Sequence, residues 1–251
     1  MGRAERSLGR KDHRPLWWRV LRSLGPLASR IPFPVLRGPL MGLRLYAVCR
    51  SSFFLGTYEP QMTRCWISLL RSGAVVYDIG AHIGWFTLIG SRLVGSQGRV
   101  YAFEPLPFNI WILHRHLQIN RITNVTLMPL AVSDRIGAVT FAFGATTGTG
   151  HISPDASFLV PTSSLDHLLT TGQILPPSVI KIDVEGAEGS VLNGAKNLLS
   201  QFRPTLLIEQ HGSNSADYES FLLSLGYQKK MLRWQRNKNP QAMYKVPPER
   251  L

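Results

Sequence analysis

The sequence predicts an α/β fold: a mostly parallel sheet of seven strands, with helices on both faces and an antiparallel hairpin closing one edge. Three observations predict it. From residue 74 onward, short apolar runs alternate with stretches of helical length, and repeated strand–helix units of this kind form parallel sheets covered on both faces. The first run ends in a turn that holds Asp78, Gly80 and Gly84. The second ends in one carboxylate, Glu104.

The first part of this pattern alternates without interruption. An apolar run predicts a strand at 75–79, and the glycine turn after it opens a helix at 85–94. A second strand-like run at 99–104 leads into a helix at 107–120. The apolar face of that helix is made of residues at helical spacing: Leu106, Ile110, Leu113 and Leu117. A third apolar run predicts a strand at 125–132.

A less regular stretch separates the third and fourth strands. The residues at 138–144 are rich in strand formers. A loop of Gly and Thr follows at 144–150, and we expect it to be mobile or ordered by a ligand. Ser164 is placed to cap a short helix over 164–169.

The last part returns to strand–helix alternation and then closes. An apolar run predicts a strand at 179–184, followed by a helix at 187–202 and a fifth strand at 205–209. A helix at 216–225 ends at Gly226. Two further strand-like segments flank a polar turn and predict the closing hairpin, 228–235 with 241–246.

Size and cysteine content narrow the class of protein. A chain of 251 residues with 44% hydrophobic content suits one globular domain with an appended segment. Cys49 and Cys65 form no disulfide framework and fit no metal-binding spacing. A reducing cytoplasm is therefore the expected compartment. The oligomeric state is left open.

The net charge of +13 is unevenly distributed. Residues 1–50 hold eleven Lys and Arg residues but only two acids, so nine of the thirteen net charges lie in the first fifth of the chain. The rest is close to neutral. A catalytic domain that binds nucleic acid carries its basic residues near its active face, so no nucleic-acid partner is expected.

The basic segment is also amphipathic. Its apolar residues recur at helical spacing: Trp17, Val20, Leu21, Leu24 and Leu27. We therefore divide the chain into a basic helical segment at 1–51 and a catalytic domain at 52–251. A helix at 15–30 could pack as a lid on the domain, or it could rest on the inner face of a membrane as a peripheral anchor. A membrane span is not expected, because arginines interrupt every apolar run before 18 residues.

The glycine turn and the acid after the second strand indicate a nucleoside pocket. A glycine turn that opens a helix presents backbone N–H groups to a ligand, and an acid on the next strand can bind the ribose hydroxyls. The spacing Asp-x-Gly-x-x-x-Gly differs from the dinucleotide pattern and resembles the pocket of S-adenosylmethionine-dependent methyltransferases. A plain turn, with Asp78 as a helix cap, is the simpler reading. The expected cofactor-binding residues are Asp78, Gly80, Ala81, His82, Gly84, Glu104, Pro105, Ala131 and Asp183.

Polar residues also gather where the later strands end. Asp183 lies on the fourth strand itself, where burial without a partner would cost several kcal/mol, so a role in the site is expected. His211 could act as a general base near neutral pH, although a hydrogen-bonded loop residue is the alternative. Glu209 and Glu185 are expected to shape the site. Carboxylates such as Glu188 in a first helical turn are also favoured by the helix dipole without any function.

Four segments together resemble the FkbM-type methyltransferases: 77–88, 102–105, 180–188 and 207–211. The segment 54–59 is similar to that family's lead-in, and the resemblance covers about residues 52–228. Its most telling part is Lys-Ile-Asp-Val-Glu-Gly-Ala-Glu at 181–188. The family usually has Asn where this chain has His82. The resemblance implies a Rossmann-like class I methyltransferase fold, S-adenosylmethionine as cofactor, and O-methylation of a sugar, glycolipid, polyketide or similar small-molecule or glycan acceptor.

Two versions of the chemistry stay open at this stage. Methyl transfer to an alcohol needs the hydroxyl placed in line and a base to take its proton, and Asp183 or His211 is the candidate base. Alternatively, Asp183, Glu209 and His211 hold Mg²⁺, which lowers the pKa of the hydroxyl. Outside this enzyme class, two readings remain: a non-catalytic membrane-associated binding module and a nicotinamide oxidoreductase. The missing third glycine disfavours the oxidoreductase.

Overall fold

The computed structural model describes residues 31–143, 150–152, 158–211, 215–232 and 239–247. It divides the chain into two compact units, 1–56 and 57–251, a few residues beyond the boundary expected from the sequence. The helix predicted at 15–30 lies outside the described residues, so its role as a lid or a membrane anchor stays a prediction. Among the helices that are described, none is long and apolar enough to cross a bilayer.

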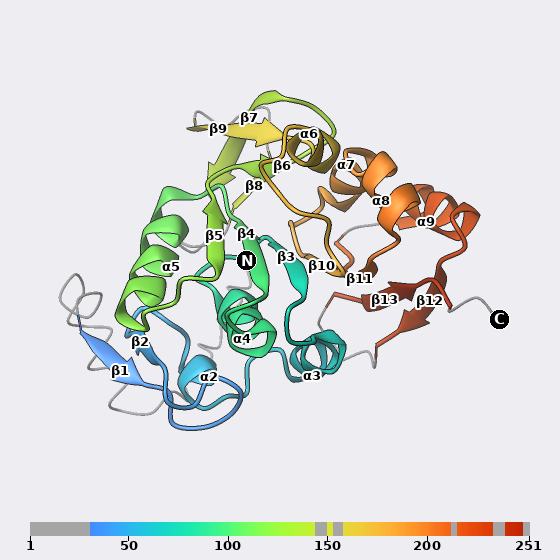
Figure 1. Cartoon of the computed structure of the whole chain (residues 1–251). Coiled ribbons are helices and arrows are strands. Elements are labelled where there is room, and N and C mark those ends of the chain that lie inside the picture. Colours follow the sequence, from blue (N-terminus) through green and yellow to red (C-terminus); the bar gives the residue numbers. More distant parts are fainter. Residues whose placement is uncertain (1–30, 144–149, 153–157, 212–214, 233–238, 248–251) are drawn as a thin grey trace, which may run out of the picture. The chain divides into compact units, whose positions relative to one another are not determined.

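The described part of the first unit, residues 31–56, holds three short elements (Figure 1). Strands β1 (Pro32–Pro34) and β2 (Arg44–Tyr46) pair antiparallel, and helix α2 spans Ser51–Phe54. Gly38 and Gly56 touch through their backbones: a Cβ atom on Gly38 would lie 2.6 Å from the Cα of Gly56. Both residues also have positive φ, so glycine is required at each position.

The second unit is built on a seven-stranded sheet in the order β12-β13-β11-β10-β3-β4-β5 (Figure 1). The strands are β3 (Val75–Ile79), β4 (Arg99–Phe103), β5 (Val125–Met128), β10 (Val179–Ile182), β11 (Thr205–Glu209), β12 (Gln228–Met231) and β13 (Gln241–Lys245). The pairs from β11 to β5 are parallel, and β13 is antiparallel to both neighbours. The predicted fold class is confirmed, closing hairpin included.

Two groups of helices belong to opposite faces of this sheet. The first group is α3 (Pro60–Leu69), α4 (Trp85–Val94) and α5 (Pro107–Ile119); the second is α6 (Leu165–Thr170), α7 (Glu188–Asn193), α8 (Lys196–Phe202) and α9 (Ser215–Ser224). Successive side chains of β3 point to opposite faces of the sheet and contact different groups of helices. Tyr77 and Ile79 belong to the buried cluster that includes Leu192 of α7, whereas Asp78 between them bonds to Thr87 of α4.

The strand predicted at 125–132 is wrong beyond Met128. The chain turns at Pro129, which has no N–H to continue the ladder, and the N–H of Leu130 donates back to the carbonyl of Met128 at 2.9 Å. A second sheet then forms in the order β6-β9-β7-β8. Its strands are β6 (Ala131–Val132), β7 (Gly137–Phe143), β8 (Gly150–Ile152) and β9 (Phe158–Ser163). Of the Gly/Thr loop at 144–150, only Gly150 is described.

The single helix predicted at 187–202 is also wrong, because it is two helices, α7 and α8. The break at Gly194 is a packing requirement: a Cβ atom there would lie 2.0 Å from the carbonyl oxygen of Ser133. The new helix start is capped from outside. The carboxylate of Asp166 accepts hydrogen bonds from the N–H groups of Asn197 at 3.0 Å and Leu198 at 2.8 Å.

Candidate active site

The polar strand ends predicted from the sequence meet at one edge of the main sheet. Strands β11, β10, β3 and β4 are neighbours and run parallel, so their carboxyl ends lie side by side. We call this edge the rim. It carries the glycine loop at 80–84 after β3, Glu104 after β4, Asp183 after β10, and Glu209 with His211 at the end of β11. Ligands of open α/β sheets bind at such an edge, where the strand order reverses.

The glycine loop is shaped by contacts inside the protein. Gly80, His82 and Gly84 all have positive φ, at 79°, 50° and 100°. A Cβ atom on Gly80 would lie 1.8 Å from the carbonyl oxygen of Asp183, and one on Gly84 would lie 2.4 Å from Leu113 Cδ1. Glycine is therefore required at both positions, because β10 and α5 pack directly on the loop.

The loop does not present a row of bare N–H groups, and that part of the sequence interpretation is wrong. The N–H groups of Gly80 and Ala81 both donate to the carbonyl of Phe103, at 3.0 and 2.9 Å. The N–H of His82 donates to Glu104, and that of Gly84 donates to Ala81. These bonds fasten the loop to the end of β4. A ligand at this loop would therefore meet a rigid backbone whose amides at these four positions already have partners.

Glu104 joins the glycine loop to helix α5. One oxygen of its buried carboxylate accepts from the N–H of Leu106 at 3.0 Å and from Asn109 Nδ2 at 3.1 Å, and the other accepts from the N–H of His82 at 2.8 Å. Burial raises the pKa of Glu104, and the hydrogen bonds only partly offset it. A carboxylate has about four acceptor positions, so these three bonds leave room for one hydroxyl.

A buried lysine connects the first strand to the fourth. Lys181 lies on β10 with its side chain 1% exposed, and its Nζ is 3.4 Å from both Asp78 Oδ1 and Asp183 Oδ2. Its ammonium also lies 4.8 Å from the ring centre of Phe86. Burial lowers the pKa of Lys181, but the charges of Asp183 and Asp78 outweigh burial and hold the pKa above its ordinary value. The second oxygen of Asp78 accepts from Thr87 Oγ1 at 2.6 Å.

His211 is surrounded by carboxylates. Its Nδ1 lies 2.8 Å from Glu188 Oε1, and its Nε2 lies 3.4 Å from Glu185 and 3.8 Å from both Asp183 and Glu209. Burial lowers the pKa of His211, but the bond to Glu188 and the charges of Asp183 and Glu185 raise it to about 9. At neutral pH this imidazole therefore carries its second proton.

Two residues outside the predicted set complete the rim. Gln241, at the start of β13, donates from Nε2 to Glu209 at 2.9 Å and to Glu59 at 2.8 Å. Burial raises the pKa of Glu209, and the charge of Asp183 raises it further. The amide of Gln241 thus bridges the two acids, and its hydrogen bonds offset the repulsion between their charges.

A divalent cation in the acidic cluster would have to compete with two cationic side chains that are already there, Lys181 and His211. Ligand atoms of Asp183, Glu209 and His211 do lie within 4.8 Å of one another. However, a metal ligand must be a neutral imidazole, so a metal would first have to displace the proton that Glu188, Asp183 and Glu185 favour on His211. The ammonium of Lys181 also lies 3.4 Å from Asp183, where it would repel a second cation. We derive no step through a metal.

The structure thus brings together most of the residues predicted for the site. Asp183, Glu185, Glu209 and His211 form one cluster, and Asp78, Gly80, Ala81, His82, Gly84 and Glu104 form the adjoining loop. Pro105 follows Glu104, while Ala131 is buried in β6 of the second sheet. Sequence reasoning assigned no role to Lys181, Gln241 or Glu59. Lys181 could have been found, because a lysine inside an apolar strand needs a buried acid as its partner.

Comparisons with known proteins show the family and the fold. The pattern of the Methyltransferase FkbM domain matches residues 78–229. The hexuronic acid methyltransferase AglP of Haloferax volcanii is 30% identical over 157 residues; the alignment spans 61% of this chain and 62% of that protein. The crystal structure of a methyltransferase FkbM from Methylobacillus flagellatus superposes with a TM-score of 0.53 at 20% identity, covering 75% of this chain and 51% of that one.

Proposed function

This chain belongs to the FkbM-type family of S-adenosylmethionine-dependent methyltransferases, and from that premise we propose that it methylates a hydroxyl oxygen of a sugar or a similar hydroxylated natural product. One observation carries the proposal: Asp183, Glu209 and His211 converge at the rim beside the glycine loop. The name of the Haloferax relative supports a sugar-type acceptor, although the alignment spans less than two thirds of that protein.

The residues present fit S-adenosylmethionine. The cofactor supplies a methyl group on a positively charged sulfur, and the rim is rich in carboxylates that favour a cation. Glu104 has one acceptor position left for a ribose hydroxyl, next to the rigid glycine loop. We therefore assign cofactor binding to the loop at 80–84 and to Glu104.

Asp183 is the stronger candidate for taking the proton from the acceptor hydroxyl. Its side chain is 28% exposed at the rim, and it lies between the cations Lys181 and His211, which fix its position. His211 with a pKa of about 9 already carries a proton at neutral pH, so it cannot accept another there. We assign His211 the role of holding Asp183, Glu185 and Glu209 together.

The function can be tested by following label from S-adenosylmethionine into defined acceptors. Calorimetry should show binding of S-adenosylhomocysteine and none of NAD. A methyl ether formed on a neutral pyranoside resists mild alkali, whereas a methyl ester formed on a hexuronate is cleaved by it. We expect alkali-stable label. Label that alkali removes would show that a carboxyl group is esterified and that no hydroxyl is methylated. Binding of NAD, with no binding of S-adenosylhomocysteine, would overturn the assignment altogether.

Metal removal provides a separate prediction. Because a divalent cation would have to compete with the Lys181 ammonium and with the proton on His211, turnover should be unchanged after dialysis against EDTA, and elemental analysis should find no stoichiometric divalent metal. Enzyme mixed with EDTA and then given excess Mg²⁺ serves as the control for chelator effects. Loss of turnover that Mg²⁺ restores would establish the metal-assisted mechanism.

A further inference from the structure

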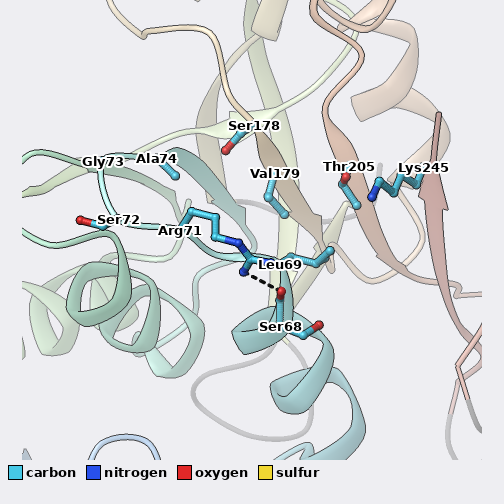
Figure 2. A pocket seen from close by; sticks show the side chains of 10 residues that line it. All are labelled: Ser68, Leu69, Arg71, Ser72, Gly73, Ala74, Ser178, Val179, Thr205 and Lys245. Atoms are coloured by element: carbon cyan, nitrogen blue, oxygen red, sulfur yellow. Dashed lines mark hydrogen bonds between the residues drawn. The ribbon is translucent and has the colours of Figure 1, made fainter. Parts of the chain in front are cut away.

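A pocket lies at the amino-terminal ends of the parallel strands, opposite the rim (Figure 2). Its walls come from the end of α3 and the residues after it, the starts of β10 and β11, and the end of β13. Its volume is about 390 Å³. Small-molecule sites occupy roughly 300–1,000 Å³. The five residues of β3 separate the two edges by roughly 16 Å, so this pocket is distinct from the rim.

The charge of this pocket is wholly positive. Arg71 and Lys245 are its charged residues, and no acid lines it. Figure 2 shows Lys245 extending from β13 toward Thr205, and Arg71 extending toward Ser68. Among the described residues, neither cation lies within ion-pair distance of a carboxylate. The two positive charges are therefore available to a ligand.

Arg71 is fixed in place with donors to spare. Its Nη1 donates to the carbonyls of Ser68 and Leu70, both at 2.8 Å, which closes the C-terminal end of α3. A guanidinium has five N–H donors, so Nε and Nη2 stay available. Because the side chain is already held, binding an anion there costs little further conformational entropy.

We propose that this pocket binds the phosphate group of a phosphate ester. Two cations match the charge of a phosphate dianion, and an arginine fork suits its oxygens. The hydroxyl of Thr205, which lies beside the Lys245 ammonium in Figure 2, adds a donor for a tetrahedral group. Leu69 and Val179 give the remaining wall an apolar part, which suits the organic portion of an ester better than free phosphate. The site is independent of the reaction at the rim.

Calorimetry on the full chain tests the proposal with three probes: inorganic phosphate, glucose 1-phosphate, and vesicles of phosphatidic acid in phosphatidylcholine. The test variant is Lys245→Gln, because no described residue bonds to the Lys245 side chain and the fold should not depend on it. We expect glucose 1-phosphate to bind and its affinity to fall about tenfold or more in this variant, the scale of one charged hydrogen bond. Arg71→Lys, which keeps the charge but loses the fork, should also weaken binding.

Arg135→Gln is the matched control, since Arg135 is exposed, pairs with Asp134 and lies outside the pocket. If vesicles bind, if Lys245→Gln weakens vesicle binding, and if the soluble esters do not bind, then the phosphate belongs to a lipid headgroup and the site still stands. If no probe binds, or if Lys245→Gln and Arg135→Gln change binding equally, the attraction is only general surface charge and the proposal is overturned. The catalytic assay is unaffected by either outcome.

Discussion

Replacing Lys181 with methionine is expected to lower the free energy of unfolding by about 3–5 kcal/mol, the cost of removing one partner from a buried ion pair. The ammonium lies 3.4 Å from Asp78, whose side chain is 1% exposed and whose Oδ1 has no hydrogen-bond partner among the described residues. Methionine has a similar length and keeps the contact with Phe86. What is lost is the charge, and Asp78 is then a buried anion without compensation.

Urea denaturation measures this effect as a shift in midpoint at constant slope. The matched control is Lys229→Met, which removes a lysine paired with Glu219 near the surface and should cost about 0–1 kcal/mol. A second variant separates charge from packing. Adding Asp78→Asn to Lys181→Met removes both members of the pair and should recover part of the loss. Equal costs for Lys181→Met and Lys229→Met would show that the buried pair does not hold β3 to β10.

Lys181 also shows why the sequence predicts the position of the site better than the contacts between its side chains. Apolar runs and strand direction predict the parallel strands and the polar residues at their carboxyl ends. They also predict that these polar residues meet at one end of the sheet: Asp78, Glu104, Asp183 and Glu209. Which acid each cation contacts depends on side-chain packing between strands that are about a hundred residues apart, as Asp78 and Lys181 are. Periodicity along the chain carries no such information.

The two misjudged elements have the same origin. The break between α7 and α8 depends on how closely Gly194 approaches Ser133, and the end of β5 depends on which sheet the residues after Pro129 join. Both are tertiary contacts. The glycine loop shows the reverse case. Gly80 and Gly84 read as ligand-binding glycines, yet Asp183 and Leu113 already require them, so their presence alone does not demonstrate a ligand.

The largest kinetic effect is expected from Asp183→Asn, which keeps the shape of the side chain and removes its basicity. Turnover should fall about 10²- to 10⁴-fold, the usual contribution of a general base, while S-adenosylhomocysteine still binds. Glu185→Gln is a suitable control, because that carboxylate is 53% exposed and lies 3.4 Å from the same imidazole. It should cost far less. Near-normal turnover in Asp183→Asn would make Asp183 a structural residue.

The pH dependence of turnover decides between Asp183 and His211 as the base. The imidazole faces Asp183 after β10, Glu185 in the following turn, Glu188 of α7 and Glu209 of β11. Burial lowers the pKa of His211, but Glu188, Asp183 and Glu185 outweigh burial and raise it to about 9. If Asp183 is the base and protonated His211 holds it in place, the rate should stay level from pH 7 to 8 and decline above about 9, as the imidazolium loses its proton.

The opposite assignment gives the opposite slope. Were His211 the base, only its neutral form would be active, and the rate would rise about tenfold per pH unit up to about 9. The pH dependence of the free energy of unfolding reports the protonation of His211 independently. Because the pKa of His211 is raised from about 6.5 in the unfolded chain, its stabilising contribution is complete below pH 6.5 and is lost as the pH rises to about 9. His211→Gln should abolish that loss of stability. A turnover that climbs to pH 9 in the wild type, together with an inactive His211→Gln, would transfer the role of base from Asp183 to His211.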